Sequence, residues 1–297
     1  MKYIGSKLFY IQIGIQLIAI LLFLVFSISV MQQAIICGIL LCTVGIPHGA
    51  NDYLFNKDKS KTGLLKFLVI YISAMGLYLA VWWWFPIGAL LIFFLISFHH
   101  FGQSNFENDH LFHFPSLIWG LWILIFPVLL HFNEAITIFK SMISLDNVLI
   151  LNNTPTESIQ PWQIYIAIIL AVIYLISLFK THSKHFILYT FQFIAVSIWY
   201  LITPLLFGFI VVFCLWHALQ SMQHQSNYYR QNFNSKPYFF FKAMIPFSLL
   251  ALLFFIAYIY FFGFKVGEAF ILLSLITLPH VLVMHKLYKP ELIEVSS

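Results

Sequence analysis

Histidines near the ends of apolar segments are the side chains in this sequence with the clearest capacity for chemistry. Five of the twelve histidines stand at or near such ends: His48, His99, His100, His217 and His280. Four of the segments start at residues 34, 86, 204 and 267, and a histidine lies 13 or 14 positions into each. At 1.5 Å per residue, each is about 20 Å from the start of its segment. Imidazoles at one depth can converge on one point, which predicts a metal centre formed by His48, His100, His217 and His280.

The ligand type narrows the choice of metal. Neutral imidazoles without thiolates suit iron, zinc or copper. The three cysteines (Cys37, Cys42 and Cys214) lie in apolar runs without a CxxC pair, so neither a disulfide framework nor a thiolate site is indicated. A single histidine near a helix end is usually solvated, but an ionisable group within a membrane span is costly and marks function. Four histidines at matched depth therefore favour metal binding.

A weak internal repeat selects the same histidines. PIGALLIFFLISFHHFGQS and PLLFGFIVVFCLWHALQS both begin with proline and end in H-x-x-Q-S, so the repeat pairs His100 with His217 and favours His100 over His99. Positions i, i+3 and i+4 share a helix face. We therefore expect a polar side chain one turn after each histidine to accept its second ring N–H and fix the tautomer. These expected partners are Asp52, Gln103, Ser104, Gln220 and Ser221. Asp52 is also a possible direct ligand.

The other histidines are predicted to lie outside the centre. Those in connections between apolar segments are expected at the surface, and they are His110, His113, His131, His182, His185 and His224. His285, five residues past His280, is expected at the membrane interface. No side chain stands out as a general acid or base, so no catalytic residue is assigned beyond the metal centre.

Composition defines the elements that must position these residues. The chain is 62% hydrophobic and 8% charged, whereas soluble domains average roughly 45–50% apolar and about 25% charged. Lipid must therefore be the solvent, and all spanning backbone must be hydrogen-bonded within helices or a closed barrel. Long apolar runs without alternation exclude the barrel. The predicted fold class is all-α, a polytopic transmembrane helix bundle of about 8–10 helices in a single domain, 1–297.

The apolar segments define a topology. They lie at residues 8–31, 34–47, 65–85, 86–100, 116–132, 161–179, 186–203, 204–221, 240–262 and 267–285. With the N-terminus in the cytoplasm, inside connections hold 13 lysines and arginines and outside connections hold 2, as the positive-inside rule requires. All four histidine-bearing segments then run from outside to inside. The predicted location is the cytoplasmic (inner) membrane.

The connections carry further signals. The net charge of +5 resides in short connections between apolar runs, which indicates topology and anionic lipid and gives no indication of nucleic acid. The first segment is too long for a signal peptide and predicts a retained anchor helix. Proline at 86 and 204 marks two tight turns between neighbouring segments. The connection 133–160 is predicted to be an amphipathic interfacial segment.

At these motifs the chain resembles the Brp/Blh family of membrane β-carotene 15,15′-dioxygenases, which supply retinal to microbial rhodopsins. The resemblance rests on PHGAND at 47–52, HHFGQS at 99–104, PLLFGFIVVFCLWHALQS at 204–221 and LPH at 278–280. It implies a multi-helix membrane fold, a histidine-bound Fe(II), and O2-dependent cleavage of the central double bond of β-carotene into two retinals. The implied partners are β-carotene, O2, the lipid bilayer and, functionally, a microbial rhodopsin.

The family pattern leaves the fourth ligand open. His48, His100 and His217 match expected ligand positions, whereas family members have another histidine one turn after the third ligand, where this chain has Ser221. Either His280 or His224 completes the set, or the site has three histidines.

Two other function classes compete with this interpretation. Di-iron desaturases and hydroxylases, which act on lipids, use dense HxxxH and HxxHH boxes that this chain lacks. A transporter would suit inverted repeats and broken helices. However, the two repeat copies run in the same direction, and no acidic relay crosses the predicted spans.

Overall fold

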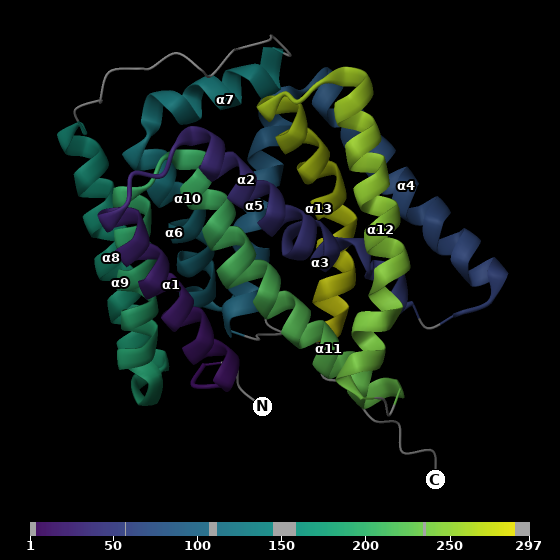
Figure 1. Cartoon of the computed structure of the whole chain (residues 1–297), viewed down its shortest axis with the longest axis horizontal. Helices are drawn as coiled ribbons and strands as arrows, with labels where there is room; N and C mark the ends of the chain where they lie inside the picture. Colours follow the sequence, from purple (N-terminus) through teal and green to yellow (C-terminus); the bar gives the residue numbers. More distant parts are fainter. Residues whose placement is uncertain (1–3, 57, 107–111, 145–158, 234–235, 289–297) are drawn as a thin grey trace.

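The structure is a computed structural model that describes residues 4–56, 58–106, 112–144, 159–233 and 236–288. Its regular elements in these ranges are helices, arranged as a bundle (Figure 1). In chain order they are α1 Lys7–Val25, α2 Val30–Leu40, η1 Leu41–Gly45, α3 Ile46–Ala50, η2 Asp52–Phe55, α4 Lys61–Trp84, α5 Pro86–Phe106, α6 Phe114–Leu130, α7 Phe132–Ser144, α8 Pro161–Thr181, η3 Ser183–His185, α9 Phe186–Ile202, α10 Leu205–Val212, η4 Phe213–Ala218, α11 Leu219–Phe233, α12 Pro237–Phe262 and α13 Val266–Tyr288.

The membrane-spanning character predicted from composition is confirmed. Within the described ranges, nine stretches are long and apolar enough to cross a membrane, and the bent pair of α6 and α7 would make a tenth. These ten correspond one to one with the ten apolar segments. The chain is therefore an all-α, multi-pass membrane protein.

Local capping shifts the first boundary. The first segment was expected to run to residue 31, but α1 ends at Val25. Ser29 accepts a hydrogen bond from the Gln32 backbone, and the Gln32 side chain accepts one from the Ser29 backbone. This capping box starts a new helix at Val30. The second span accordingly runs from Val30 to Phe55, longer than the expected 34–47.

Helix α7 lies across the end of the bundle (Figure 1). It meets α6 at an angle of 106°. Its side chains at Ala135, Ile138 and Met142 are buried, whereas Lys140 is exposed. The amphipathic character expected for the connection 133–160 is thus present in α7. Residues 145–158 of that connection lie outside the described residues.

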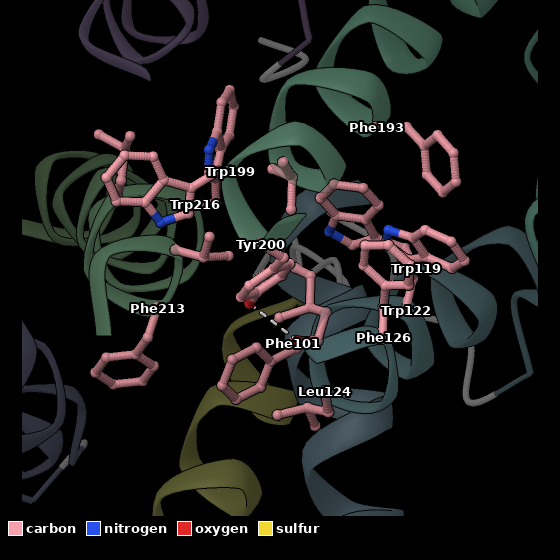
Figure 2. Close-up of a cluster of buried hydrophobic side chains, with 14 of the residues drawn as sticks. Phe101, Trp119, Trp122, Leu124, Phe126, Phe193, Trp199, Tyr200, Phe213 and Trp216 are labelled. Atoms are coloured by element: carbon pink, nitrogen blue, oxygen red, sulfur yellow. Dashed lines mark hydrogen bonds between the residues drawn. The ribbon is translucent and has the colours of Figure 1, made fainter. Parts of the chain in front are cut away.

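Small residues allow the closest helix contact, between α5 and α6. A Cβ on Gly102 would come within 1.9 Å of the Ser116 carbonyl oxygen, and one on Gly120 within 1.9 Å of the Phe98 carbonyl oxygen. Small residues at such crossings let backbones approach closely in membranes. Around this crossing, Trp122 packs with Phe193 of α9 and Phe126 packs with Tyr200 of α9 (Figure 2). Trp119 stacks on Tyr174 of α8.

The orientation in the membrane remains a prediction, and it can be tested by labelling. Segments 57–66 and 230–242 should both be cytoplasmic because they carry much of the positive charge. In a cysteine-free variant, Lys61→Cys and Lys236→Cys should react with an impermeant maleimide only after the cells are permeabilised. Lys265→Cys, predicted outside, should react in intact cells. Labelling of the first two positions from opposite faces would contradict the ten-span topology.

Candidate functional site

The fold brings together the four histidines that sequence reasoning selected. His48 lies on α3, His100 on α5, His217 on η4 and His280 on α13, and all four are buried. The ring centroid of His48 lies 5.4 Å from that of His217 and 5.3 Å from that of His280. His100 lies 4.6 Å from His217 and 5.1 Å from His280 in the same measure. Each ring therefore has two histidine neighbours.

Two π-helical turns present this group. Turn η1 ends directly before the helix of His48, and η4 contains His217. Such turns are rare and often occur at functional sites. The two turns pack against each other, since a Cβ on Gly45 would come within 3.3 Å of the Phe213 ring and 3.4 Å of the Cys214 sulfur. On the other side, the His217 ring stacks on Phe101, with centroids 4.2 Å apart.

Hydrogen bonds at Nδ1 fix the tautomers of three of the rings. The His48 Nδ1 bonds the Gly45 carbonyl oxygen, which can only accept. The Nδ1 of His280 lies 2.7 Å from the Asp52 carboxylate. For these two rings, Nδ1 donates, and Nε2 keeps its lone pair.

The tautomer of His217 follows from its partner. Its Nδ1 lies 3.0 Å from the Ser104 hydroxyl oxygen. That hydroxyl already donates its proton to the Phe101 carbonyl oxygen at 2.9 Å. The Ser104 oxygen therefore accepts from the His217 Nδ1–H, and the Nε2 of His217 also keeps its lone pair. The fourth ring, His100, has no hydrogen-bond partner on either nitrogen.

The expected pattern of partners on the same helix is wrong. Asp52 follows His48 but binds His280, and Ser104 follows His100 but binds His217. For His48 and His217, the local backbone explains why the partner is not on the same helix. The helix of His48 ends two residues later, at Ala50, and His217 lies within a π turn, so the i+3 and i+4 register does not hold there.

The other expected partners bind elsewhere. Gln103 lies 3.3 Å from His285, Gln220 donates to Asn105 at 2.9 Å, and Ser221 accepts from Gln225 at 3.4 Å. Of the five partners expected from the sequence, Asp52 and Ser104 are the two that hydrogen-bond to a ring of the four histidines.

Several supporting residues were missed in the sequence. The Tyr71 hydroxyl donates to the second Asp52 oxygen at 2.8 Å, which fixes the carboxylate for His280. The Gln225 amide donates to the His48 carbonyl oxygen at 2.9 Å. On α1, Gln12 donates to the Leu215 carbonyl oxygen, and Gln16 accepts from the Trp216 indole at 3.1 Å. We call these two hydrogen bonds from α1 to η4 the brace. Two glutamines four residues apart in an apolar segment are a sequence signal that could have identified it.

The remaining histidines stay outside the group of four. His99 faces His285, with ring centroids 6.1 Å apart, and His224 bonds the Leu287 carbonyl oxygen at 3.2 Å. The prediction of surface positions is only partly correct, because the described histidines of the connections are half-buried: His113, His131, His182, His185 and His224. His110 lies outside the described residues.

All four rings line one cavity of about 950 Å³, its open mouth included. Most other lining side chains are aliphatic or aromatic and come from α5, α6, α7, α10, η4 and α13. The Ser97 hydroxyl is buried without a partner and lies one turn before His100. As they stand, the His, Cys, Asp and Glu side chains of the described residues form no group of three or more arranged to hold a metal ion.

Comparison with known proteins shows the family of this chain. The family model described as beta-carotene 15,15'-dioxygenase matches residues 39–288. The chain belongs to this family. The match includes all four histidines and leaves out α1. A curated family member, the beta-carotene 15,15'-dioxygenase of uncultured marine bacterium 66A03, is 28% identical over 207 residues, covering 63% of this chain and 70% of the relative. No solved structure matches the chain.

The brace from α1 to η4 leads to a prediction about stability. Replacing Gln16 by Leu leaves the buried Trp216 N–H without its acceptor, which costs about 1–3 kcal/mol. We expect Gln16→Leu to lower the melting temperature of the purified protein in detergent. The control is Gln223→Leu on α11, whose side chain is exposed and makes an exposed hydrogen bond to Asn227. Equal melting temperatures for Gln16→Leu and the control would show that α1 does not support η4.

Proposed function

We propose that this chain cleaves the central double bond of β-carotene with O2, yielding two molecules of all-trans retinal, at an Fe(II) held by His48, His100, His217 and His280. One observation carries the proposal: four imidazoles from four separate segments meet at an apolar cavity. Membership of the family supports carotenoid cleavage as the general reaction.

The spacing of the rings supports one metal ion between them. An imidazole bound through Nε2 places its ring centre about 3.2 Å from the metal, so two rings on one ion are about 4.5–5.2 Å apart. Two neighbouring ring pairs, 4.6 and 5.1 Å apart, fall within this range, and the other two, 5.3 and 5.4 Å apart, lie just above it.

Hydrogen bonding supports the same assignment. Three rings donate from Nδ1 and so offer the Nε2 lone pair, and the fourth, His100, has both nitrogens available. A carboxylate behind a metal-binding imidazole is a recurrent arrangement, and Asp52 behind His280 matches it. A buried imidazole without any partner, as at His100, is costly unless a ligand satisfies it.

The chain's own residues hold the substrate for this reaction. The aromatic and aliphatic wall receives the polyene, excludes water and holds the polyene beside the histidines. The bound iron would supply the chemistry that lets O2 react with the polyene. One C=C bond is replaced by two C=O bonds and both oxygen atoms enter the products, so neither a proton nor a reductant is consumed. Among the residues that the structure describes, those that line the cavity include no carboxylate and no lysine.

The setting of the reaction follows from its substrate and product. β-Carotene dissolves in the lipid bilayer, which also surrounds the bundle. Retinal is the chromophore of microbial rhodopsins, so such a protein in the same membrane is the expected consumer. We propose the cytoplasmic membrane as the location of the reaction, because the lysines and arginines gather in the connections on one side.

Alanine substitutions test the ligand set. His217→Ala and His280→Ala should abolish retinal formation and lower bound iron, because each removes one imidazole of the group. His224→Ala and His285→Ala should retain most activity and iron, because neither ring joins the four. The assay is retinal yield from β-carotene and iron per protein at matched expression. An inactive His224→Ala together with an active His280→Ala would identify the wrong fourth ligand.

The contact between Asp52 and His280 predicts how strongly two substitutions should lower the affinity for iron. Loss of a carboxylate that orients a metal-bound histidine lowers metal affinity by about 10–100-fold. We expect Asp52→Asn to retain the fold and to lose iron at correspondingly lower chelator concentrations. Tyr71→Phe removes the hydrogen bond to the same carboxylate and should have a smaller effect in the same direction. Iron retention equal to wild type in Asp52→Asn would mean that His280 does not bind the metal.

A further inference from the structure

The cavity is a passage with the four histidines at one end. On α5, the residues that line it include Leu90 and His100, and on α13 they include Phe270 and His280. In each pair the two residues are ten positions apart, which is about 15 Å of helix. The lining between these ends is apolar apart from the hydroxyls of Ser97 and Thr277.

Helix α7 closes the other end. Ala135, Ile138, Phe139 and Met142 line the passage there; Phe139 is half-buried, and the other three are buried. The helix is seated on the start of α13, since a Cβ on Gly267 would come within 2.3 Å of the Ser141 hydroxyl and 3.2 Å of the Met142 nitrogen. In Figure 1, α7 runs across the bundle above the start of α13. We call Ala135, Ile138 and Met142 the end wall.

The passage also has an opening toward lipid. Ile276 lines the cavity although 41% of its surface is exposed. Gly49, next to His48, also lines it, and a Cβ added there would meet no atom within 4 Å. The wall beside the histidines is therefore incomplete, and a long substrate can extend past them.

We infer that the end wall on α7 sets which double bond is cleaved, by stopping one ring of the substrate. An extended conjugated chain with bonds of about 1.4 Å advances about 1.2 Å per carbon, so half of β-carotene, from its central bond to the far edge of its ring, measures about 14 Å. This is close to the about 15 Å of helix between Leu90 and His100 on α5 and between Phe270 and His280 on α13. With one ring against the end wall, the central double bond lies beside the histidines and the other half extends toward the opening at Ile276.

This inference rests on the proposed function and names the residues that fix its regiochemistry. The end wall lies on α7, whereas the four histidines lie on α3, α5, η4 and α13, so we expect it to act on the position of the substrate alone. Neighbouring double bonds of the polyene are two carbons apart, about 2.4 Å. A change of one large side chain in the end wall is of that size, and it should move the cleaved bond by one position.

The test compares end-wall variants for the length of the aldehydes they form. Ala135→Phe shortens the passage, and Met142→Ala lengthens it without adding bulk to a packed site. Purified wild type and variants receive β-carotene, and chromatography with mass spectrometry quantifies the products. Wild type should form retinal. Each variant should raise the ratio of unequal aldehydes to retinal by about tenfold or more, the discrimination expected when an apolar pocket loses its fit.

The matched control is Thr137→Phe. It adds the same ring to the same helix, but residue 137 does not line the cavity, so retinal should remain the product. Active end-wall variants that form only retinal would overturn the inference and leave the proposed function intact. Wild type that forms no retinal would overturn the proposed function instead. If Ala135→Phe does not fold, Met142→Ala alone decides, since a deeper passage shifts the cleaved bond whatever happens to the shorter one.

Discussion

A buried polar group in a membrane protein must find its partner inside the protein, because lipid offers none. Three of the four central imidazoles meet this requirement through Nδ1, with the Gly45 carbonyl oxygen, the Ser104 hydroxyl and the Asp52 carboxylate as partners. Each partner both satisfies a ring and orients it. Much of the surrounding structure serves to place these three groups.

The partners reach across helices, so the site depends on how the helices pack. Ser104 on α5 supports the ring on η4, and Asp52 on η2 supports the ring on α13. This cross-connection requires α5 to be fixed relative to its neighbours. The glycine contacts at Gly102 and Gly120 fix it against α6, and the aromatic core shown in Figure 2 fills the space around that crossing.

The cavity has a polar end at the histidines and an apolar passage toward α7. The histidine end is surrounded by hydrogen-bonded side chains, whereas the passage toward α7 is almost wholly apolar. An apolar wall binds every segment of a polyene about equally and cannot by itself select one double bond. Selection therefore needs a stop at a fixed distance, which is the role we propose for the transverse helix α7. The same helix explains why the bundle departs from straight spans between Phe114 and Ser144.

The membrane fold, the ten apolar segments and the choice of the four central histidines could be predicted from the amino-acid sequence. These follow from composition and from depth along helices, both of which are properties of single segments. The supporting contacts required the tertiary structure. Whether Asp52 serves His48 or His280 depends on where the helix of His48 ends and on which helix lies beside it. The brace from Gln16 to Trp216, 200 positions away, and the closing of the passage by α7 likewise depend on contacts between distant segments. Periodicity within one segment carries no information about such neighbours.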